Sequence, residues 1–265
     1  MRRYLQVARA ALQKAMITQK VIWAARSFGL LVSEFAAFLR RPNISNDVEL
    51  SSREKAGTGI GLFVLSIVTT IIFGVLALPV ILSSELTTGE QLNNSLSGSA
   101  WSVLLSLVVL GPLVEEIIFR GWLSGTWRSV LASAFGLTAI YGGAALLDPY
   151  VVEGGVIKSL ILAAGAIAIF SVFSSLLDAT QIFGFERIFP FFFYVQAIAF
   201  GVLHFQNYAA NSVAIALLAT LPLIACGLIW GYARVRLGLA SAVILHAAYN
   251  VPPAIGSIIM VHSAG

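Results

Sequence analysis

Residues 58–82 read TGIGLFVLSIVTTIIFGVLALPVIL, an uninterrupted apolar stretch without a charged side chain. At about 1.5 Å per residue, a helix of this length crosses the ~30 Å hydrocarbon core of a bilayer. Further apolar runs of comparable character follow at 100–119, 130–147, 155–177, 189–206, 211–233 and 237–261. We therefore expect an all-α polytopic transmembrane bundle of about seven spans, or eight if one helix is split.

Composition points to the same class of protein. Of the 265 residues, 58% are hydrophobic and only 11% are charged, whereas a soluble domain carries about 25% charged residues. The mean hydropathy is +0.92. These values exclude most soluble folds, disordered chains and fibrous repeats. An outer-membrane barrel is disfavoured too, because the apolar stretches are continuous and do not alternate with polar residues.

The N-terminal region, residues 1–57, is expected to be a cationic amphipathic arm and linker that precede a membrane domain at 58–265. Eight of the sixteen Lys and Arg residues lie within residues 1–41, where only Glu34 opposes them. Such a block favours a cytoplasmic N-terminus and contact with anionic lipid headgroups. In this context the basic pI does not indicate a nucleic-acid partner. With Cys226 as the single cysteine, an intrachain disulfide is excluded.

Three groups of polar residues interrupt the apolar helices, where ionisable side chains are costly. The groups are Val114-Glu115-Glu116-Ile117-Ile118-Phe119-Arg120, Phe200-Gly201-Val202-Leu203-His204 and His246-Ala247-Ala248-Tyr249-Asn250. Taken singly, a membrane histidine or asparagine most often joins neighbouring helices, and a Glu–Arg pair can be an interfacial salt bridge. The coincidence of all three groups in one chain favours a shared site.

Helical spacing separates the roles of the two glutamates. Glu116 and Arg120 are four residues apart, so they share a face and can pair. Glu115 points about 100° away around the helix axis. Two adjacent carboxylates in low dielectric are not both expected to ionise unless one is compensated. Arg120 would hold Glu116 as an anion, which leaves Glu115 suited to accept a proton from water.

The second pair with helical spacing is His246 and Asn250, again four residues apart on one face. A ring nitrogen and an amide NH₂ aimed at a common point are suitable donors for a developing oxyanion. His204 lies on a third predicted helix. If the three helices pack together, their polar groups would meet in one hydrated pocket.

In this order, the Glu-Glu-x-x-x-Arg, Phe-x-x-x-His and His-x-x-x-Asn motifs resemble the CPBP family, the CAAX prenyl proteases and bacteriocin-processing proteins, also called the Abi family. The resemblance covers residues 100–255, more than half of the chain. It implies an intramembrane endopeptidase in which Glu115, helped by His204, activates a water. His246 and Asn250 would stabilise the oxyanion, while Glu116 and Arg120 would support the site. Polypeptides entering from the membrane, prenylated CAAX-type or other precursors, would be the substrates.

The resemblance does not decide whether the site holds a metal ion. Members of the family have been called metalloproteases, and Glu115, His204 and His246 could be ligands of zinc with one position left for water. A metal-free mechanism driven by the glutamate is equally consistent with the family, and it is the one that we favour. Two other classes also stay open: a transporter that uses the buried Glu and His side chains as a proton relay, and a non-catalytic membrane scaffold or immunity protein.

Overall fold

The computed structural model describes residues 27–44, 50–84, 86–88, 99–147, 179–209 and 212–263, with six single positions between 165 and 176. Two compact units, Met1–Arg41 and Pro42–Gly265, divide the chain. In the first unit, residues 27–40 are helical. The predicted lipid-binding arm before residue 27 and most of the predicted span 155–177 lie outside the described residues, and so do residues 45–49 of the predicted linker.

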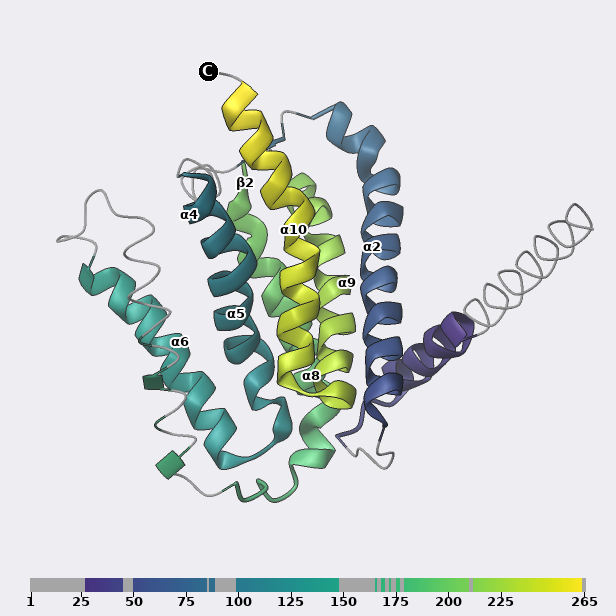
Figure 1. Cartoon of the computed structure of the whole chain (residues 1–265), viewed down its shortest axis with the longest axis vertical. Coiled ribbons are helices and arrows are strands. Elements are labelled where there is room, and N and C mark those ends of the chain that lie inside the picture. The colour runs from purple at the N-terminus through teal and green to yellow at the C-terminus, as the bar shows by residue number, and fades with distance from the viewer. Residues whose placement is uncertain are drawn as a thin grey trace, which may run out of the picture. The chain divides into compact units, whose positions relative to one another are not determined.

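The second unit confirms the expected all-α membrane class (Figure 1). Its elements are α2 Ser52–Leu82, β1 Thr87–Thr88, α4 Ala100–Leu104, π-helix η1 Leu105–Leu110, α5 Gly111–Arg120, 3₁₀-helix η2 Gly121–Ser124, α6 Trp127–Leu147, α8 Phe185–Leu203, 3₁₀-helix η3 His204–Asn207, β2 Tyr208–Ala209, α9 Val213–Leu237 and α10 Leu239–Ser263. The strands form one short antiparallel pair. Tyr208 in β2 lies between η3 and α9, and burial raises the pKa of its hydroxyl above the ordinary value.

Within the described residues, five helical stretches are long and apolar enough to cross a membrane. They are Ser52–Leu82, Ala100–Ser124, Phe185–Leu203, Val213–Leu237 and Leu239–Ile259. The helix α6 also coincides with the predicted span 130–147. The protein is therefore an integral membrane protein, while the side of the membrane on which its N-terminus lies stays a prediction.

The first span begins earlier than position 58, where the apolar run alone would start it. Ser51 and Glu54 form a capping box: the Ser51 hydroxyl accepts from the Glu54 amide, and the Glu54 carboxylate accepts from the Ser51 amide at 2.9 Å. A capping box satisfies two backbone donors that a helix start otherwise leaves open. Residues 52–57, which the sequence assigns to the linker, therefore extend α2 as a polar first turn.

The connection between the last two spans is also shorter than expected. The sequence places Arg234 and Arg236 in a turn, but both lie in the last turn of α9. The break comes at Gly238, whose φ of +96° lies in a region that side-chain-bearing residues rarely adopt. The prediction of the turn was wrong because cationic side chains are favoured at a helix C-terminus, so they mark the end of α9 rather than a loop.

A π turn interrupts the regular α-helical hydrogen bonding of the span that carries the two glutamates. The Gly111 amide donates to the Ser106 carbonyl, five residues back. A Cβ on Gly111 would lie 2.8 Å from that carbonyl oxygen, so this position requires glycine. Pro112 follows and has no N–H, which leaves the Leu107 carbonyl without the backbone donor that the π pattern would supply. The side-chain amide of Asn250 takes that place at 2.8 Å.

The helix α9 joins the other spans. It packs against α2, α8 and α10, and α10 packs in turn against η1 and α5 (Figure 1). The approach of α8 to α9 is close: a Cβ on Gly227 would lie 3.0 Å from the Ala197 Cα. This packing brings the polar groups of α5, α8 and α10 to one region of the bundle.

Candidate active site

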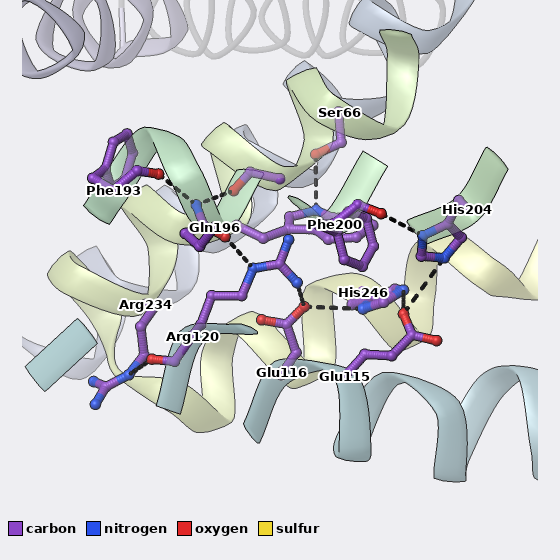
Figure 2. Close-up of polar contacts among 12 residues, drawn as sticks. Ser66, Glu115, Glu116, Arg120, Phe193, Gln196, Phe200, His204, Arg234 and His246 are labelled. Carbon is purple, nitrogen blue, oxygen red and sulfur yellow. Dashed lines mark hydrogen bonds and ion pairs between the residues drawn. The ribbon is translucent and has the colours of Figure 1, made fainter. Parts of the chain in front are cut away.

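Glu116 is the centre of a buried polar cluster (Figure 2). Its Oε1 accepts from Arg120 Nη1 at 2.6 Å and lies 2.9 Å from His246 Nδ1. The side chains of Glu116 and Arg120 are both 0% exposed. The pairing that the four-residue spacing predicts is therefore present, and the structure adds His246 from α10 as a second partner of the same oxygen.

Arg120 is held by α8 as well as by its own helix. Its Nε donates to Gln196 Oε1 at 2.9 Å, and its guanidinium carbon lies 4.2 Å from the centre of the Phe200 ring. The Gln196 amide nitrogen in turn donates to the carbonyls of Phe193 and Gly227. Reasoning from the sequence missed Gln196, although an amide flanked by apolar residues on both sides was a usable signal.

A second arginine caps the C-terminal end of α5. Arg234 on α9 donates to the carbonyl of Arg120 at 3.1 Å and to that of Gly121 at 3.4 Å. The last carbonyls of a helix have no partner within it and carry partial negative charge, so a cation there is stabilising. Arg234 thereby ties α9 to the end of α5, a role that the sequence did not suggest.

His204 presents its Nε2 to Glu115. Its Nδ1 lies 2.6 Å from the Phe200 carbonyl oxygen, one turn earlier in the chain. A carbonyl can only accept, so Nδ1 carries the hydrogen and, in the neutral ring, Nε2 carries a lone pair. That Nε2 lies 3.7 Å from Glu115 Oε2, which is too far for a direct hydrogen bond.

His246 faces the same oxygen from the other side. Its Nδ1 is committed to Glu116, and its Nε2 lies 3.8 Å from Glu115 Oε2. Within the described part of the chain, no group donates a hydrogen bond to this buried oxygen. The side chain of Glu115 is nevertheless 32% exposed, whereas that of His246 is 3% exposed. Two ring nitrogens and a carboxylate from three different helices therefore converge on one point.

Asn250 belongs to a neighbouring feature rather than to this cluster. It lies one turn beyond His246 on α10, as the spacing predicts, but its amide donates to the Leu107 carbonyl of the π turn. One of its two amide hydrogens is thus engaged in holding the backbone before Glu115. Its predicted part in an oxyanion hole stays a prediction.

A zinc site at Glu115, His204 and His246 is not supported by the geometry. Among the residues that the structure describes, no group of three His, Cys, Asp or Glu side chains is arranged to hold a metal ion. The interpretation of the protein as a metalloprotease therefore has no support from this site.

An apolar groove of about 430 Å³ lies between α5 and the start of α10. It is lined by Leu113, Ile117, Leu239, Ala240, Val243 and Ile244. Ile117 directly follows Glu116 in the sequence, and Val243 lies one turn before His246. The groove therefore shares both of its helices with the polar site.

Comparison with known proteins identifies the family of the chain. The sequence model described as Type II CAAX prenyl endopeptidase Rce1-like matches residues 97–252, more than half of the chain. No curated protein and no solved structure gives a match. The matched segment contains all six residues that the sequence singled out, from Glu115 to Asn250, and the family implies a CAAX-type intramembrane protease, a hydrolase. The chain belongs to the Rce1-like family of type II CAAX prenyl endopeptidases.

Proposed function

We propose that the protein hydrolyses a peptide bond of prenylated CAAX-type substrates with a water activated by Glu115. The observation that carries the proposal is the convergence of Glu115 Oε2 with the Nε2 atoms of His204 and His246 at 3.7 and 3.8 Å. Because the Nδ1 hydrogen of His204 points at the Phe200 carbonyl, His204 Nε2 and Glu115 Oε2 are two acceptors that face each other, and they need a donor of hydrogen bonds between them. A water molecule, with two O–H groups, satisfies that requirement.

In the proposed reaction, Glu115 takes a proton from the water while the hydroxide oxygen bonds to the scissile carbonyl carbon. His204 helps to orient the water, because its Nδ1 is fixed on the Phe200 carbonyl and its ring cannot turn away. The tetrahedral intermediate then collapses, the C–N bond breaks, and the proton held by Glu115 passes to the departing amine nitrogen. Such general acid–base catalysis contributes about 10²–10⁴-fold to the rate.

The oxyanion of the intermediate would be stabilised from α10. With Nδ1 directed at Glu116, His246 donates through Nε2 only as an imidazolium. Asn250 would add the amide hydrogen that is not engaged with Leu107. Glu116 and Arg120 support this arrangement from the buried side.

The substrate class rests on the family and on the groove. A prenyl chain is apolar, and the groove of about 430 Å³ between α5 and α10 is lined by apolar side chains. Burial of apolar area is worth about 25 cal/mol per Å², so a chain bound there would bring its attached peptide to the polar site. We therefore expect a farnesylated CAAX peptide to be cleaved in preference to the same peptide without the prenyl group.

The test is cleavage of that farnesylated peptide by purified protein in detergent. Glu115→Gln keeps the shape of the side chain but removes the base, and we expect kcat to fall by at least about 100-fold. We expect His204→Ala to lower kcat by a comparable factor. The control is Glu186→Gln, the same chemical change at an exposed position on α8, which should leave kcat unchanged. Full cleavage by both Glu115→Gln and His204→Ala would refute the proposed roles.

A further inference from the structure

Three contacts hold the ring of His246. Its Nδ1 is directed at Glu116, its face stacks on the Trp230 indole at a centroid distance of 4.1 Å and 23°, and Phe200 meets it edge-on at 5.6 Å. Only Nε2 is left to face Glu115. The plane of the indole therefore helps to decide where the reacting nitrogen points.

Trp230 is in turn oriented by the first span. Its Nε1 donates to the Ser66 hydroxyl oxygen on α2 at 3.2 Å, and that hydroxyl donates to the Leu62 carbonyl at 2.9 Å. Trp230 is 1% exposed, and Ser66 and Leu62 are 0% exposed. In such a site an indole N–H without a partner is costly, so the hydrogen bond selects one orientation of the ring. Figure 2 shows the link from Ser66 toward the cluster.

The span that supplies Ser66 is not part of the segment that matches the family. The match covers residues 97–252, whereas α2 ends at Leu82. Nevertheless α2 packs along α9, beside the helix that carries the histidine. A second contact follows one turn later, where the Thr70 and Tyr249 hydroxyls lie 2.8 Å apart. The first span is thus joined to both α9 and α10 at the level of the site.

We infer that Ser66 and Trp230 are positioning residues, through which α2 sets the orientation of the His246 ring for catalysis. The inference rests on the proposed function, because it assigns a purpose to the orientation of Nε2. Misplacement of a catalytic group by about 1 Å can cost about 100-fold in rate. A purely structural pair would instead affect the stability of the protein without a selective effect on kcat.

The experiment measures kcat, KM and the unfolding temperature of three variants with the farnesylated CAAX peptide. Ser66→Ala removes the hydroxyl that accepts from Trp230 and donates to the Leu62 carbonyl, and Trp230→Phe keeps a flat ring without the N–H. We expect each to lower kcat about fivefold to tenfold at unchanged KM, the equivalent of roughly one hydrogen bond. Trp230→Leu removes the flat face, and we expect a loss of about 100-fold.

The double variant Ser66→Ala, Trp230→Phe decides whether the serine acts through the indole. If it does, Ser66→Ala adds nothing to Trp230→Phe, and the effects are not multiplicative. The control is Thr220→Val, which removes a fully buried hydroxyl on α9 that donates to the Leu217 carbonyl. It should not change kcat.

Several outcomes would overturn the inference: wild-type kcat in Ser66→Ala, multiplicative effects in the double variant, or an equal fall of kcat in Thr220→Val. These results differ from a failure of the proposed function, which would appear as undiminished cleavage by Glu115→Gln. Because Ser66→Ala is a small change in a packed helix, it keeps the test informative even if Trp230→Leu does not fold.

Discussion

Glu115 and Glu116 are adjacent in the chain but lie in different environments. Glu116 is enclosed by Arg120 and His246. One oxygen of Glu115 lies between two imidazoles, and the side chain of Glu115 is partly exposed. Buried charges in proteins are tolerated only when they are paired and hydrogen-bonded. The buried pair therefore acts as the anchor, and the second carboxylate is left available for a reaction.

The anchor depends on Gln196, which the structure places against Arg120. Gln196→Leu would leave the buried Nε of Arg120 without an acceptor, and we expect a loss of about 1–3 kcal/mol in unfolding free energy. Thermal unfolding in detergent measures the change. A side chain at Gly231 would disturb the same partner, because a Cβ there would lie 2.7 Å from Gln196 Nε2. A Gln196→Leu protein as stable as the wild type would show that Arg120 does not need this partner.

Among the helices, the span from Ala100 to Ser124 deviates most from a regular α-helix. Its π turn at Leu105–Leu110 directly precedes the helix of the two glutamates. π turns are short and are frequent at functional sites. An extra residue within one turn rotates everything that follows about the helix axis, so the turn decides which way Glu115 points. Asn250 stabilises that turn from α10.

Replacement of Asn250 by Leu should destabilise the turn. The Leu107 carbonyl would lose its donor, and we expect the unfolding free energy to fall by about 1–3 kcal/mol. Pro112→Ala restores a backbone N–H next to the turn, so the double variant should recover part of that loss. Thermal unfolding of the two single variants and the double variant measures the recovery. Equal destabilisation of Asn250→Leu in both backgrounds would contradict this account of the π turn.

Across the whole second unit, α9 is the shared neighbour of the helices that build the site. Arg234 ties it to the end of α5, Gly227 lets α8 approach, and Trp230 contacts the His246 ring. The basic N-terminal region predicts which end of the bundle faces the cytoplasm, since cytoplasmic segments are enriched in Lys and Arg. This orientation is open to direct measurement.

Cysteine labelling at the two ends of α2 tests the orientation. Lys55 and Ser83 are both exposed and lie at opposite ends of this one helix, so the result does not depend on the total number of spans. We expect a membrane-impermeant maleimide to label Ser83→Cys in intact cells, and Lys55→Cys only after permeabilisation. The native Cys226 is buried and should stay unlabelled. The reverse pattern would invert the predicted orientation.

The length of the apolar runs was enough to predict a helical membrane protein, because a bilayer accepts only segments that satisfy their own backbone. Helical spacing likewise predicted the Glu116–Arg120 pair, since residues four apart on a helix must be neighbours. Both inferences depend on local geometry. The ends of α2 and α9 were missed, because a capping box and a positive φ set them rather than hydropathy.

Only the packing of the helices decided the rest. Gln196, Trp230 and Ser66 reach the site from helices far away in the sequence, and no spacing rule relates one helix to another. The same applies to Asn250, whose spacing from His246 is regular but whose partner is a carbonyl exposed by Pro112 on another span. Contacts between helices depend on side-chain volume and on close approach at glycines, and these become visible only when the bundle is assembled.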